Sequence, residues 1–275
     1  MKSTLQQISV EVVLSTYRAE VELRLILDGF LRQTEPNYSI AVADDGSGPG
    51  AGGIVTEFAD RGLRVRHVWQ EDRGFRKARI LNKAIAGSSA EYVVLLDGDC
   101  IPSRHFVRDH MDWAEPGRYA CGRRVMLGPV ISDAILEKRL DPSRLENPLR
   151  LLAAEARGQL RRSWVGVRGP RLVSRMLSQK ERGMWGCNAG VWMSDLVRIN
   201  GFNNEFEGWG HEDVDLERRL LAADVRPKAL RGMGAVYHLY HPSNSNLQNE
   251  PLWTMGRRQA VVEVSSGLRE CLAED

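Results

Sequence analysis

The stretch EYVVLLDGDC, residues 91–100, decides the fold. It starts with an almost continuous apolar run, which is typical of a parallel strand covered by helices on both faces. The run stops at Asp97-Gly98-Asp99. Because ligands of such sheets bind beyond the carboxyl ends of the strands, these carboxylates predict an α/β protein with its chemistry at this strand end.

The residues before this stretch alternate between strand-like and helix-like segments. Strands are expected at residues 8–14, 38–43 and 63–69, and helices at residues 20–33 and 76–86. A Gly-rich loop after residue 47 leads into a short helix that ends at residue 60. The alternation predicts a doubly wound, Rossmann-like α/β fold, with a mostly parallel central sheet and helices on both faces.

Paired aspartates follow two of the strands. Asp97 and Asp99 are spaced to hold a hard divalent cation that also binds phosphate oxygens, although a polar turn would explain them too. Asp44 and Asp45 can accept hydrogen bonds from a base N–H or from ribose hydroxyls. The Gly46-Ser47 pair after them also suits an Asx turn, and both interpretations can hold together.

The helix at residues 76–86 opens with cationic side chains. Gly74 is followed by Arg76, Lys77, Arg79 and Asn82. Cations and free N–H groups at a helix N-terminus favour phosphate. A solvated helix face explains the same residues equally well, so both interpretations stay open.

The sharpest local pattern is WGHEDVD, residues 209–215, which opens a helix predicted over residues 212–223. Glu212 and Asp213 fall in the first turn, where the helix dipole stabilises carboxylates. Ordinary N-terminal charge would account for these acids. It does not account for Trp209 between two glycines, which suits a platform for stacking a sugar.

Two histidines follow the last apolar strand, in VYHLYHPSNS at residues 236–245. His238 and His241 can complete a cation site that the aspartates begin. A lone histidine is more often structural than a ligand, but two within four residues carry more weight.

Composition places the chain among soluble globular proteins. Of its 275 residues, 43% are apolar and 27% are charged, and the formal net charge of +2 gives no reason to expect nucleic acid as a partner. The four cysteines form no C-x-x-C pair, so we expect reduced thiols. We find no secretory leader and no apolar run that could cross a bilayer, and we therefore expect a cytoplasmic protein.

Residues 157–182 form a basic stretch with eight cationic side chains and one acid, interleaved with apolar residues. Three interpretations stay open: a solvated helical insert, a mobile lid over a ligand, or a patch that contacts anionic lipid or an acidic glycan. We favour an insert near the site where a second substrate, the acceptor, would bind. Peripheral contact with the inner face of a membrane stays open.

Taken in order, the segments resemble a known family. ISVEVVLSTY (8–17), QTEPNYSIAVADDGS (33–47), DRGFRKARILNKAI (72–85) and VVLLDGDC (93–100) resemble the successive motifs of family 2 glycosyltransferases of the GT-A fold. NAGVWMSDLVRINGFNNEFEGWGHEDVDLERRL (188–220) resembles the catalytic segment of β-1,4-galactosyltransferases and of bacterial chondroitin polymerases.

The resemblance implies roles for the matching positions. Contacts with the donor nucleotide, with uridine as the expected base, and with its phosphates would come from Thr16, Tyr17, Asp44, Asp45, Arg76, Arg79 and Asp97. Mn²⁺ or Mg²⁺ on the diphosphate would be held by Asp97, Asp99 and His241, with His238 as the alternative to His241. The general base would be Asp213, with Glu212 beside it. The donor sugar and the acceptor would meet Trp209, Trp185 and His211, the last of which stands where the galactosyltransferases have glycine.

The implied protein is an inverting, metal-dependent glycosyltransferase. It would form a single GT-A domain over residues 1–275, with a nucleotide-sugar half (1–127), a basic helical insert (128–183) and an acceptor half (184–275). The donor would be a UDP-sugar, and the acceptor a saccharide or lipid-linked saccharide of a bacterial surface glycan.

Two rival functions remain. GPGAGG at residues 48–53 contains G-x-G-x-x-G and suggests an NAD-dependent enzyme. Against it, Asp44 and Asp45 precede the glycines and would repel a pyrophosphate, and Pro49 stiffens the loop. The other rival is a non-catalytic protein that binds sugar nucleotides or glycans. The intact Glu212-Asp213 pair argues against it.

Overall fold

β4 (Tyr92–Asp97) is the strand expected from the apolar run, and it is buried along its length up to Asp97. It belongs to a computed structural model that describes residues 8–177, 183–184, 186–242, 248–249, 254 and 261–272. Trp185 and the end of the basic stretch, residues 178–182, lie outside the described residues.

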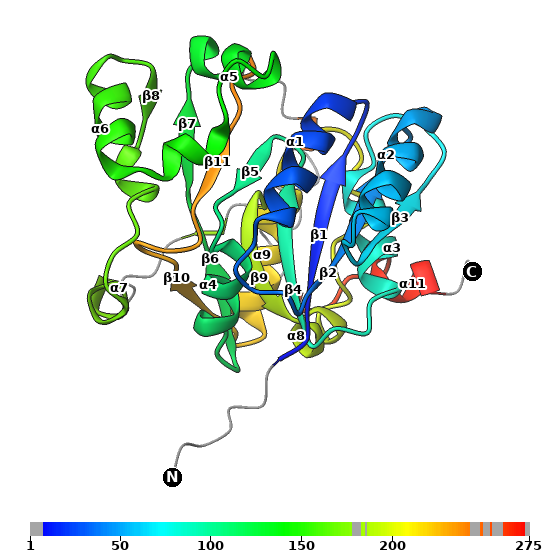
Figure 1. The fold of residues 1–275 in the computed structure, drawn as a ribbon. Coiled ribbons are helices and arrows are strands. Elements are labelled where there is room, and N and C mark those ends of the chain that lie inside the picture. The colour runs from blue at the N-terminus through cyan, green and yellow to red at the C-terminus, as the bar shows by residue number, and fades with distance from the viewer. Residues whose placement is uncertain are drawn as a thin grey trace.

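β4 lies in the middle of a seven-stranded sheet with the order β10-β6-β9-β4-β1-β2-β3 (Figure 1). The other strands of this sheet are β1 (Val10–Thr16), β2 (Ser39–Asp44), β3 (Val65–Trp69), β6 (Arg118–Cys121), β9 (Asn188–Trp192) and β10 (Arg226–Ala229). β1 pairs in parallel with β2 and β4, whereas β9 runs antiparallel to β4 and β6. The expected mostly parallel, Rossmann-like sheet is confirmed.

Helices cover both faces of this sheet, and β1 shows why. Val12 and Leu14 join the core on one face and Val13 joins the core on the other, because successive side chains of a strand alternate between faces. The first face is covered by α1 (Glu20–Leu31), α2 (Pro49–Asp60) and α4 (Phe106–Trp113). The second is covered by α3 (Lys77–Ala86), α8 (Met193–Arg198), α9 (Glu212–Ala222) and α11 (Leu268–Leu272).

The Gly-rich stretch at residues 48–53 is helical, whereas we expected a loop before a short helix. Gly48 is the N-cap of α2, and Pro49 occupies the first helical position, where its missing N–H leaves no hydrogen bond unmade. Gly50 lets α1 come close, because a Cβ there would lie 2.2 Å from Glu20 Oε1. Gly50 therefore serves helix packing, and residues 49–53 are helical, so they do not form a loop that could wrap a pyrophosphate.

A second sheet, which the sequence did not predict, has the order β5-β11-β7-β8. Its strands are β5 (Cys100–Pro102), β7 (Arg124–Leu127), β8 (Leu160–Arg161) and β11 (Val236–His238). β5 begins directly after Asp99 and runs antiparallel to β11, so that Cys100 lies opposite His238. His238 is thus the last residue of a strand, whereas we expected it after the strand.

The region at residues 128–183 is mainly helical over its described part, and one of its segments joins the second sheet. It contains α5 (Pro129–Leu136), η1 (Pro142–Glu146), α6 (Pro148–Ala156), η2 (Ser163–Val165) and α7 (Arg171–Leu177). Between α6 and η2, the short strand β8 pairs with β7 and places buried Leu160 opposite Leu127. Within the described residues, no helix combines the length and the apolar character that a membrane span requires.

Candidate active site

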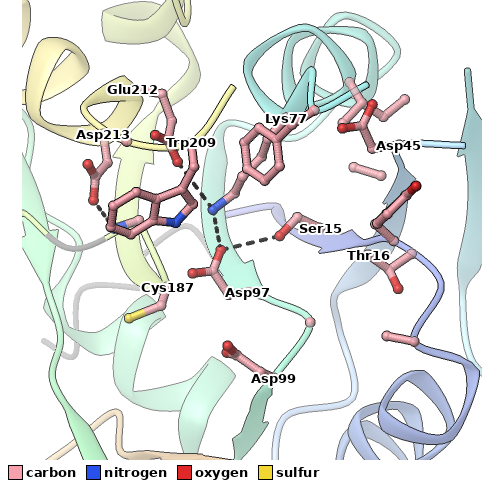
Figure 2. Close-up of a pocket in the computed structure, with 18 of the residues that line it drawn as sticks. Ser15, Thr16, Asp45, Lys77, Asp97, Asp99, Cys187, Trp209, Glu212 and Asp213 are labelled. Carbon is pink, nitrogen blue, oxygen red and sulfur yellow. Dashed lines mark hydrogen bonds and ion pairs between the residues drawn. The ribbon is translucent and has the colours of Figure 1, made fainter. Parts of the chain in front are cut away.

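A cavity of about 670 Å³ opens where β1, β2 and β4 end, at the strand ends where ligands of parallel sheets bind. Figure 2 shows the segment after β1 on one side, the start of α9 on the other, and Asp97 and Asp99 between them. Ten of the expected site residues line it, namely Thr16, Tyr17, Asp45, Asp97, Asp99, Trp209, His211, Glu212, Asp213 and His241.

A lysine at the start of α3 holds Asp97. Lys77 Nζ lies 2.7 Å from Asp97 Oδ1 and 3.5 Å from Glu212 Oε1. Ser15 Oγ donates to the same oxygen of Asp97 at 3.2 Å. Burial opposes the charge of Lys77, but Asp97 and Glu212 outweigh it and hold the pKa of Lys77 well above its ordinary value. Lys77 therefore stays protonated and ties the end of β4 to the start of α9.

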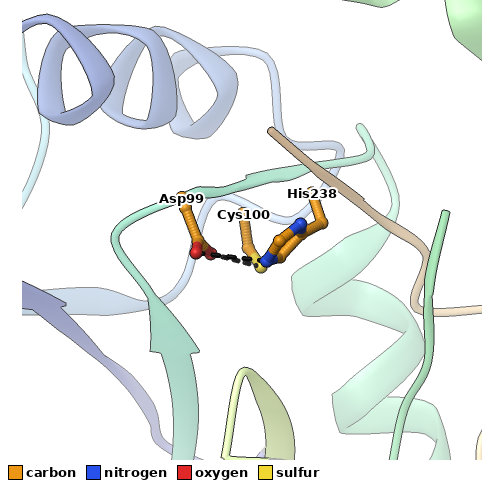
Figure 3. Close-up of side chains that lie close together, drawn as sticks. All are labelled: Asp99, Cys100 and His238. Carbon is orange, nitrogen blue, oxygen red and sulfur yellow. Dashed lines mark hydrogen bonds and ion pairs between the residues drawn. The ribbon is translucent and has the colours of Figure 1, made fainter. Parts of the chain in front are cut away.

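Asp99 forms a second cluster, which we call the Asp99 corner, with Cys100, His238 and His241. The Nε2 atoms of both histidines lie 3.2 Å from Asp99 Oδ2, and Cys100 Sγ lies 3.1 Å from Asp99 Oδ1. In Figure 3, Asp99, Cys100 and His238 converge, with one potential ligand atom of each within 4.8 Å of the others. Burial disfavours the charge of Asp99, but the two imidazoles outweigh it and hold the pKa of Asp99 well below its usual range.

The two histidines of the corner have different surroundings. The side chain of His238 is 5% exposed and that of His241 is 54% exposed. Neither ring nitrogen of His238 makes a well-directed hydrogen bond to any described residue, which is rare for a buried polar group. The hydrogen bond with Asp99 raises the pKa of His241 in spite of its partial burial. The sequence left a choice between the two histidines, and the structure places both against the same carboxylate oxygen.

The aspartate pair after β2 has a different surrounding. Asp44 is fully buried and does not line the cavity. Its Oδ2 lies 2.9 Å from His67 Nε2, and its Oδ1 accepts a hydrogen bond from the Ser47 N–H at 2.8 Å, as in the Asx turn that the sequence allowed. Asp45 does line the cavity, and its Oδ2 accepts from the Arg76 N–H at 2.7 Å.

Arg76 and Arg79, which the resemblance assigned to the donor phosphates, are not among the described residues that line the cavity. Arg76 is the N-cap of α3, and its Nη2 donates to the Glu71 carbonyl at 2.5 Å. Arg79 lies two positions after Lys77, and residues at that spacing do not share a helix face. The helix therefore turns Lys77 toward Asp97.

Glu212 and Asp213 open α9, as expected, after His211 in a left-handed conformation with φ of 71°. Asp213 is half-buried, and its Oδ2 accepts from the Gly186 N–H at 3.1 Å. Burial raises the pKa of Glu212, with Lys77 opposing the shift and Asp213 adding to it. The cavity thus holds one carboxylate beside a lysine and another on a backbone amide.

The Trp209 loop is fixed by two amide side chains that sequence reasoning missed. Gly208 and Gly210 have φ values of 85° and 104°, which glycine adopts without strain. Gln248 Oε1 accepts from the Trp209 N–H at 3.0 Å. Asn249 Nδ2 donates to the carbonyls of Gly208 and Gly210, each at 2.9 Å. This bracing places the indole beside Asp213 (Figure 2).

The cavity lining is strongly acidic. Among the described residues that line it, two cationic side chains, Lys77 and Arg124, stand against the six carboxylates of Glu22, Asp45, Asp97, Asp99, Glu212 and Asp213. A diphosphate would be repelled by this lining unless a cation accompanied it. The oxygen and imidazole ligands of the Asp99 corner suit a divalent ion of the Mn²⁺ type.

Sequence reasoning also missed Arg124 and Cys187 in the cavity and gave Lys77 no individual role. Arg124 reaches the cavity on β7, a strand of the sheet that was not predicted. Lys77 carried a usable signal, because it is the first residue of the helix that precedes the strand ending in Asp97, but the neighbouring arginines looked equally suitable.

Comparison with known proteins agrees with the fold and with the order of the motifs. The model of Glycosyl transferase family 2 matches residues 11–193, and that of the N-terminal domain of galactosyltransferase matches residues 175–242. Validoxylamine A glucosyltransferase of Streptomyces hygroscopicus subsp. limoneus is 27% identical over 86% of the chain and 53% of its own length. Chondroitin synthase of Pasteurella multocida is 21% identical over 90% of the chain and 26% of its own length.

Two solved structures share the fold. The mannosyltransferase PcManGT from Pyrobaculum calidifontis, in complex with GDP-Man and Mn²⁺, has a TM-score of 0.59 and 19% identity over 94% of this chain and 63% of its own. TarS 1-349 of S. aureus, in complex with UDP-GlcNAc, has a TM-score of 0.62 and 13% identity over 97% of this chain and 71% of its own.

The chain spans about half the length of validoxylamine A glucosyltransferase and about a quarter of the length of chondroitin synthase. The family 2 match covers more than half of the chain, from β1 through β9, and includes both aspartate pairs and Lys77. With the parallel-rich sheet and the acidic cavity at its strand ends, this match shows that the chain belongs to glycosyl transferase family 2.

Proposed function

We propose that the chain transfers a sugar from a UDP-sugar to a hydroxyl of a saccharide or lipid-linked saccharide, with a divalent cation and with inversion at the anomeric carbon. The observation that carries the proposal is that one cavity combines the Asp99 corner with the Asp213 carboxylate at a different edge (Figure 2). Inversion by direct displacement needs this division, because the base and the leaving group act on opposite sides of the reacting carbon.

The cation is assigned to Asp99, His238 and His241, with Asp97 as a further carboxylate. This assignment rests on the 3.2 Å contacts of both imidazoles with one oxygen and on the buried His238 ring that lacks a hydrogen-bond partner among the described residues. Imidazole ligands favour Mn²⁺ over Mg²⁺, which prefers oxygen. A cation bound here would neutralise charge on the diphosphate as it leaves.

Asp213 is assigned as the general base that takes the proton of the acceptor hydroxyl. The Gly186 N–H fixes one carboxylate oxygen, and the side chain faces the cavity beside Trp209. Glu212 is assigned to hydroxyls of the donor sugar or acceptor. Trp209 is assigned as the apolar platform under a sugar ring, with His211 at the same edge.

The nucleotide is assigned to the opposite edge, where Thr16, Tyr17 and Asp45 line the cavity. Lys77 and Arg124, in place of Arg76 and Arg79, are the protein cations near the diphosphate. Asp44 would act indirectly, by fixing the turn that carries Asp45. The UDP-GlcNAc in the TarS complex supports uridine, and the GDP-Man in the mannosyltransferase complex makes guanosine the competing base.

Support for the acceptor class comes from the relatives, whose names describe a validoxylamine A glucosyltransferase and a chondroitin synthase. Both names point to a saccharide-like hydroxyl. We extend the proposed acceptors to lipid-linked saccharides. We also propose that the chain acts at the cytoplasmic face of a membrane.

A donor-hydrolysis screen tests the function without a known acceptor. The chain would be incubated with UDP- and GDP-sugars, with Mn²⁺, with Mg²⁺ or with EDTA, and release of the nucleotide diphosphate would be measured. We expect slow hydrolysis of a UDP-sugar with Mn²⁺ and none with EDTA. Asp99→Asn should abolish the signal, whereas Asp60→Asn, an exposed change at the end of α2, should not. Hydrolysis that is indifferent to EDTA and to Asp99→Asn would overturn the metal assignment.

A further inference from the structure

Large apolar side chains project into solvent from α6 and the short helix η2 that follows it. Leu149 is 78% exposed, and Leu152 and Trp164 are each 50% exposed. Leu149 and Leu152 are three residues apart and therefore share one face of α6. The helix buries Leu151 and Ala154 instead, so the exposed leucines are not needed to hold α6 in place.

Trp164 is held next to α6 by a set of polar contacts. Glu155, on α6, accepts hydrogen bonds from the Arg162 N–H at 2.7 Å, from the Ser163 N–H at 3.3 Å and from the Ser163 hydroxyl. These bonds fix the start of η2 against the helix. Trp164 therefore projects from an ordered segment that is bonded to α6.

Arginines lie on the same segments of the chain as these apolar side chains. Arg150, Arg157 and Arg161 are exposed, and none of them forms an ion pair with a carboxylate among the described residues. The nearby carboxylate, Glu155, is engaged with the backbone of η2. We call the six side chains of Leu149, Arg150, Leu152, Arg157, Arg161 and Trp164 the α6–η2 patch.

We propose that the α6–η2 patch docks the protein on an anionic lipid surface. Interfacial binding of this kind combines burial of apolar side chains at the headgroup boundary with attraction of cations to anionic lipid. An acidic polysaccharide would satisfy the arginines but would leave both leucines in water, which favours lipid as the occupant. The patch begins at α6, before the basic stretch that the sequence indicated for membrane contact.

The patch is attached firmly to the wall of the cavity. Strand β8 carries Arg161 and pairs with β7, where Arg161 lies opposite Met126. Arg124, at the start of β7, lines the cavity. In Figure 1, α6 and β8 form the outer edge of the molecule beyond β7. If the proposed function holds, docking would keep the cavity near a lipid-linked acceptor, but docking itself requires no glycosyl transfer.

Vesicle sedimentation tests the docking. The chain would be mixed with large vesicles of phosphatidylcholine, with and without 40 mol% phosphatidylglycerol, in 50 mM or 500 mM NaCl. We expect binding only with phosphatidylglycerol and mainly at low salt. Arg150→Gln with Arg157→Gln and Arg161→Gln should weaken it about 100-fold. Leu149→Ser with Trp164→Ser should weaken it roughly tenfold.

A matched control variant removes the same number of positive charges from other parts of the surface, so that it has the same net charge as the arginine variant of the patch. Arg24, Arg118 and Arg226 are exposed on other elements, and changing these three to Gln should leave vesicle binding within about threefold. Circular dichroism would verify that all variants are folded. The proposal fails if the wild type does not sediment with phosphatidylglycerol vesicles at low salt. It also fails if the arginine variant of the patch and the control variant lose binding equally. Binding to dextran sulfate through the patch, without vesicle binding, would also overturn it in favour of an acidic glycan.

Discussion

The α9 side of the cavity and the Asp99 corner both present carboxylates, but the groups that accompany these carboxylates differ. On the α9 side, the protein supplies its own cation, because Lys77 lies 3.5 Å from Glu212 and 2.7 Å from Asp97. At the corner, Asp99 has two imidazoles for neighbours, one buried and one half exposed. An imidazole can lose its proton near neutral pH and then bind a metal, whereas the lysine stays charged.

This difference predicts that the two regions respond differently to added metal and to pH. On the α9 side, Lys77 supplies a positive charge from within the chain, so the geometry there should not depend on added metal. If the corner binds a cation as proposed, it should respond to pH and to metal, because protons and the cation would compete for the same nitrogen atoms. Substitutions on the two sides should therefore affect different measurements, and five predictions test that separation.

The largest expected effect is that of Asp213→Asn on the α9 side. The asparagine keeps the shape and can still accept from the Gly186 N–H, but it cannot take a proton. We expect transfer to fall by about 10²–10⁴-fold, with Mn²⁺-dependent binding of the nucleotide nearly unchanged. Product assays and calorimetry measure the two quantities. Asp224→Asn, an exposed change beyond the end of α9, is the matched control. Normal turnover of Asp213→Asn would falsify the assignment of the base.

Asp99→Asn should show the reverse pattern at the corner. It removes the carboxylate that both histidines contact, and we expect Mn²⁺-dependent nucleotide binding to weaken by at least about tenfold. Binding in EDTA should stay the same as in the wild type. Calorimetry of UDP with Mn²⁺ and with EDTA makes the comparison. If Asp99→Asn and Asp213→Asn lowered metal-dependent binding equally, the two sides would not be separable.

Lys77→Met tests whether the α9 side depends on its internal cation. The change leaves Asp97 and Glu212 close together without their shared positive charge, and we expect it to cost about 1–3 kcal/mol of unfolding free energy. Urea unfolding measures this cost with Mn²⁺ and with EDTA. The loss should be similar in both, and Lys77→Arg should restore part of it. A loss that Mn²⁺ fully reverses would show that the side relies on metal after all.

The smallest expected effect is the pH dependence of the corner. A metal binds neutral imidazole, and the hydrogen bond with Asp99 raises the pKa of His241. Competition by protons should therefore begin above the ordinary histidine pKa of about 6.5 and weaken Mn²⁺ binding several-fold between pH 8 and pH 6.5. In Asp99→Asn the weakening should begin at lower pH. Titration of Mn²⁺ binding across this range measures both.

Without metal, lower pH should stabilise the fold through His241, whereas lower pH should weaken the binding of metal. Because its pKa is raised on folding, the stabilisation from protonated His241 is complete below the ordinary histidine pKa and is lost as pH rises through the raised value. Thermal unfolding in EDTA should show this trend in the wild type and not in His241→Ala. Stability that rises with pH through this range, with no difference between the two proteins, would contradict the role of the Asp99–His241 pair.

Much of the architecture could be predicted because it rests on short-range patterns. The apolar run before Asp97 indicated a buried parallel strand, and the acidic first turn at Glu212 indicated the start of a helix. The Gly-rich stretch at residues 48–53 misled us, because a glycine motif looks alike whether it wraps a phosphate or lets two helices approach. Only the contact between Gly50 and Glu20 distinguishes these cases.

By itself, the sequence determined the α/β fold class, the positions of the paired aspartates at strand ends and the family resemblance, since each depends on residues close together in the chain. The tertiary structure alone decided that Lys77 faces the cavity, that Asp44 is buried in a turn, and that His238 and His241 share Asp99. The second sheet, which joins Cys100 to His238, was also decided there. The physical reason is that strand pairing and helix rotation bring together groups from different elements, in the case of Asp99 and His238 more than a hundred residues apart, and no local pattern records which side chain will face which.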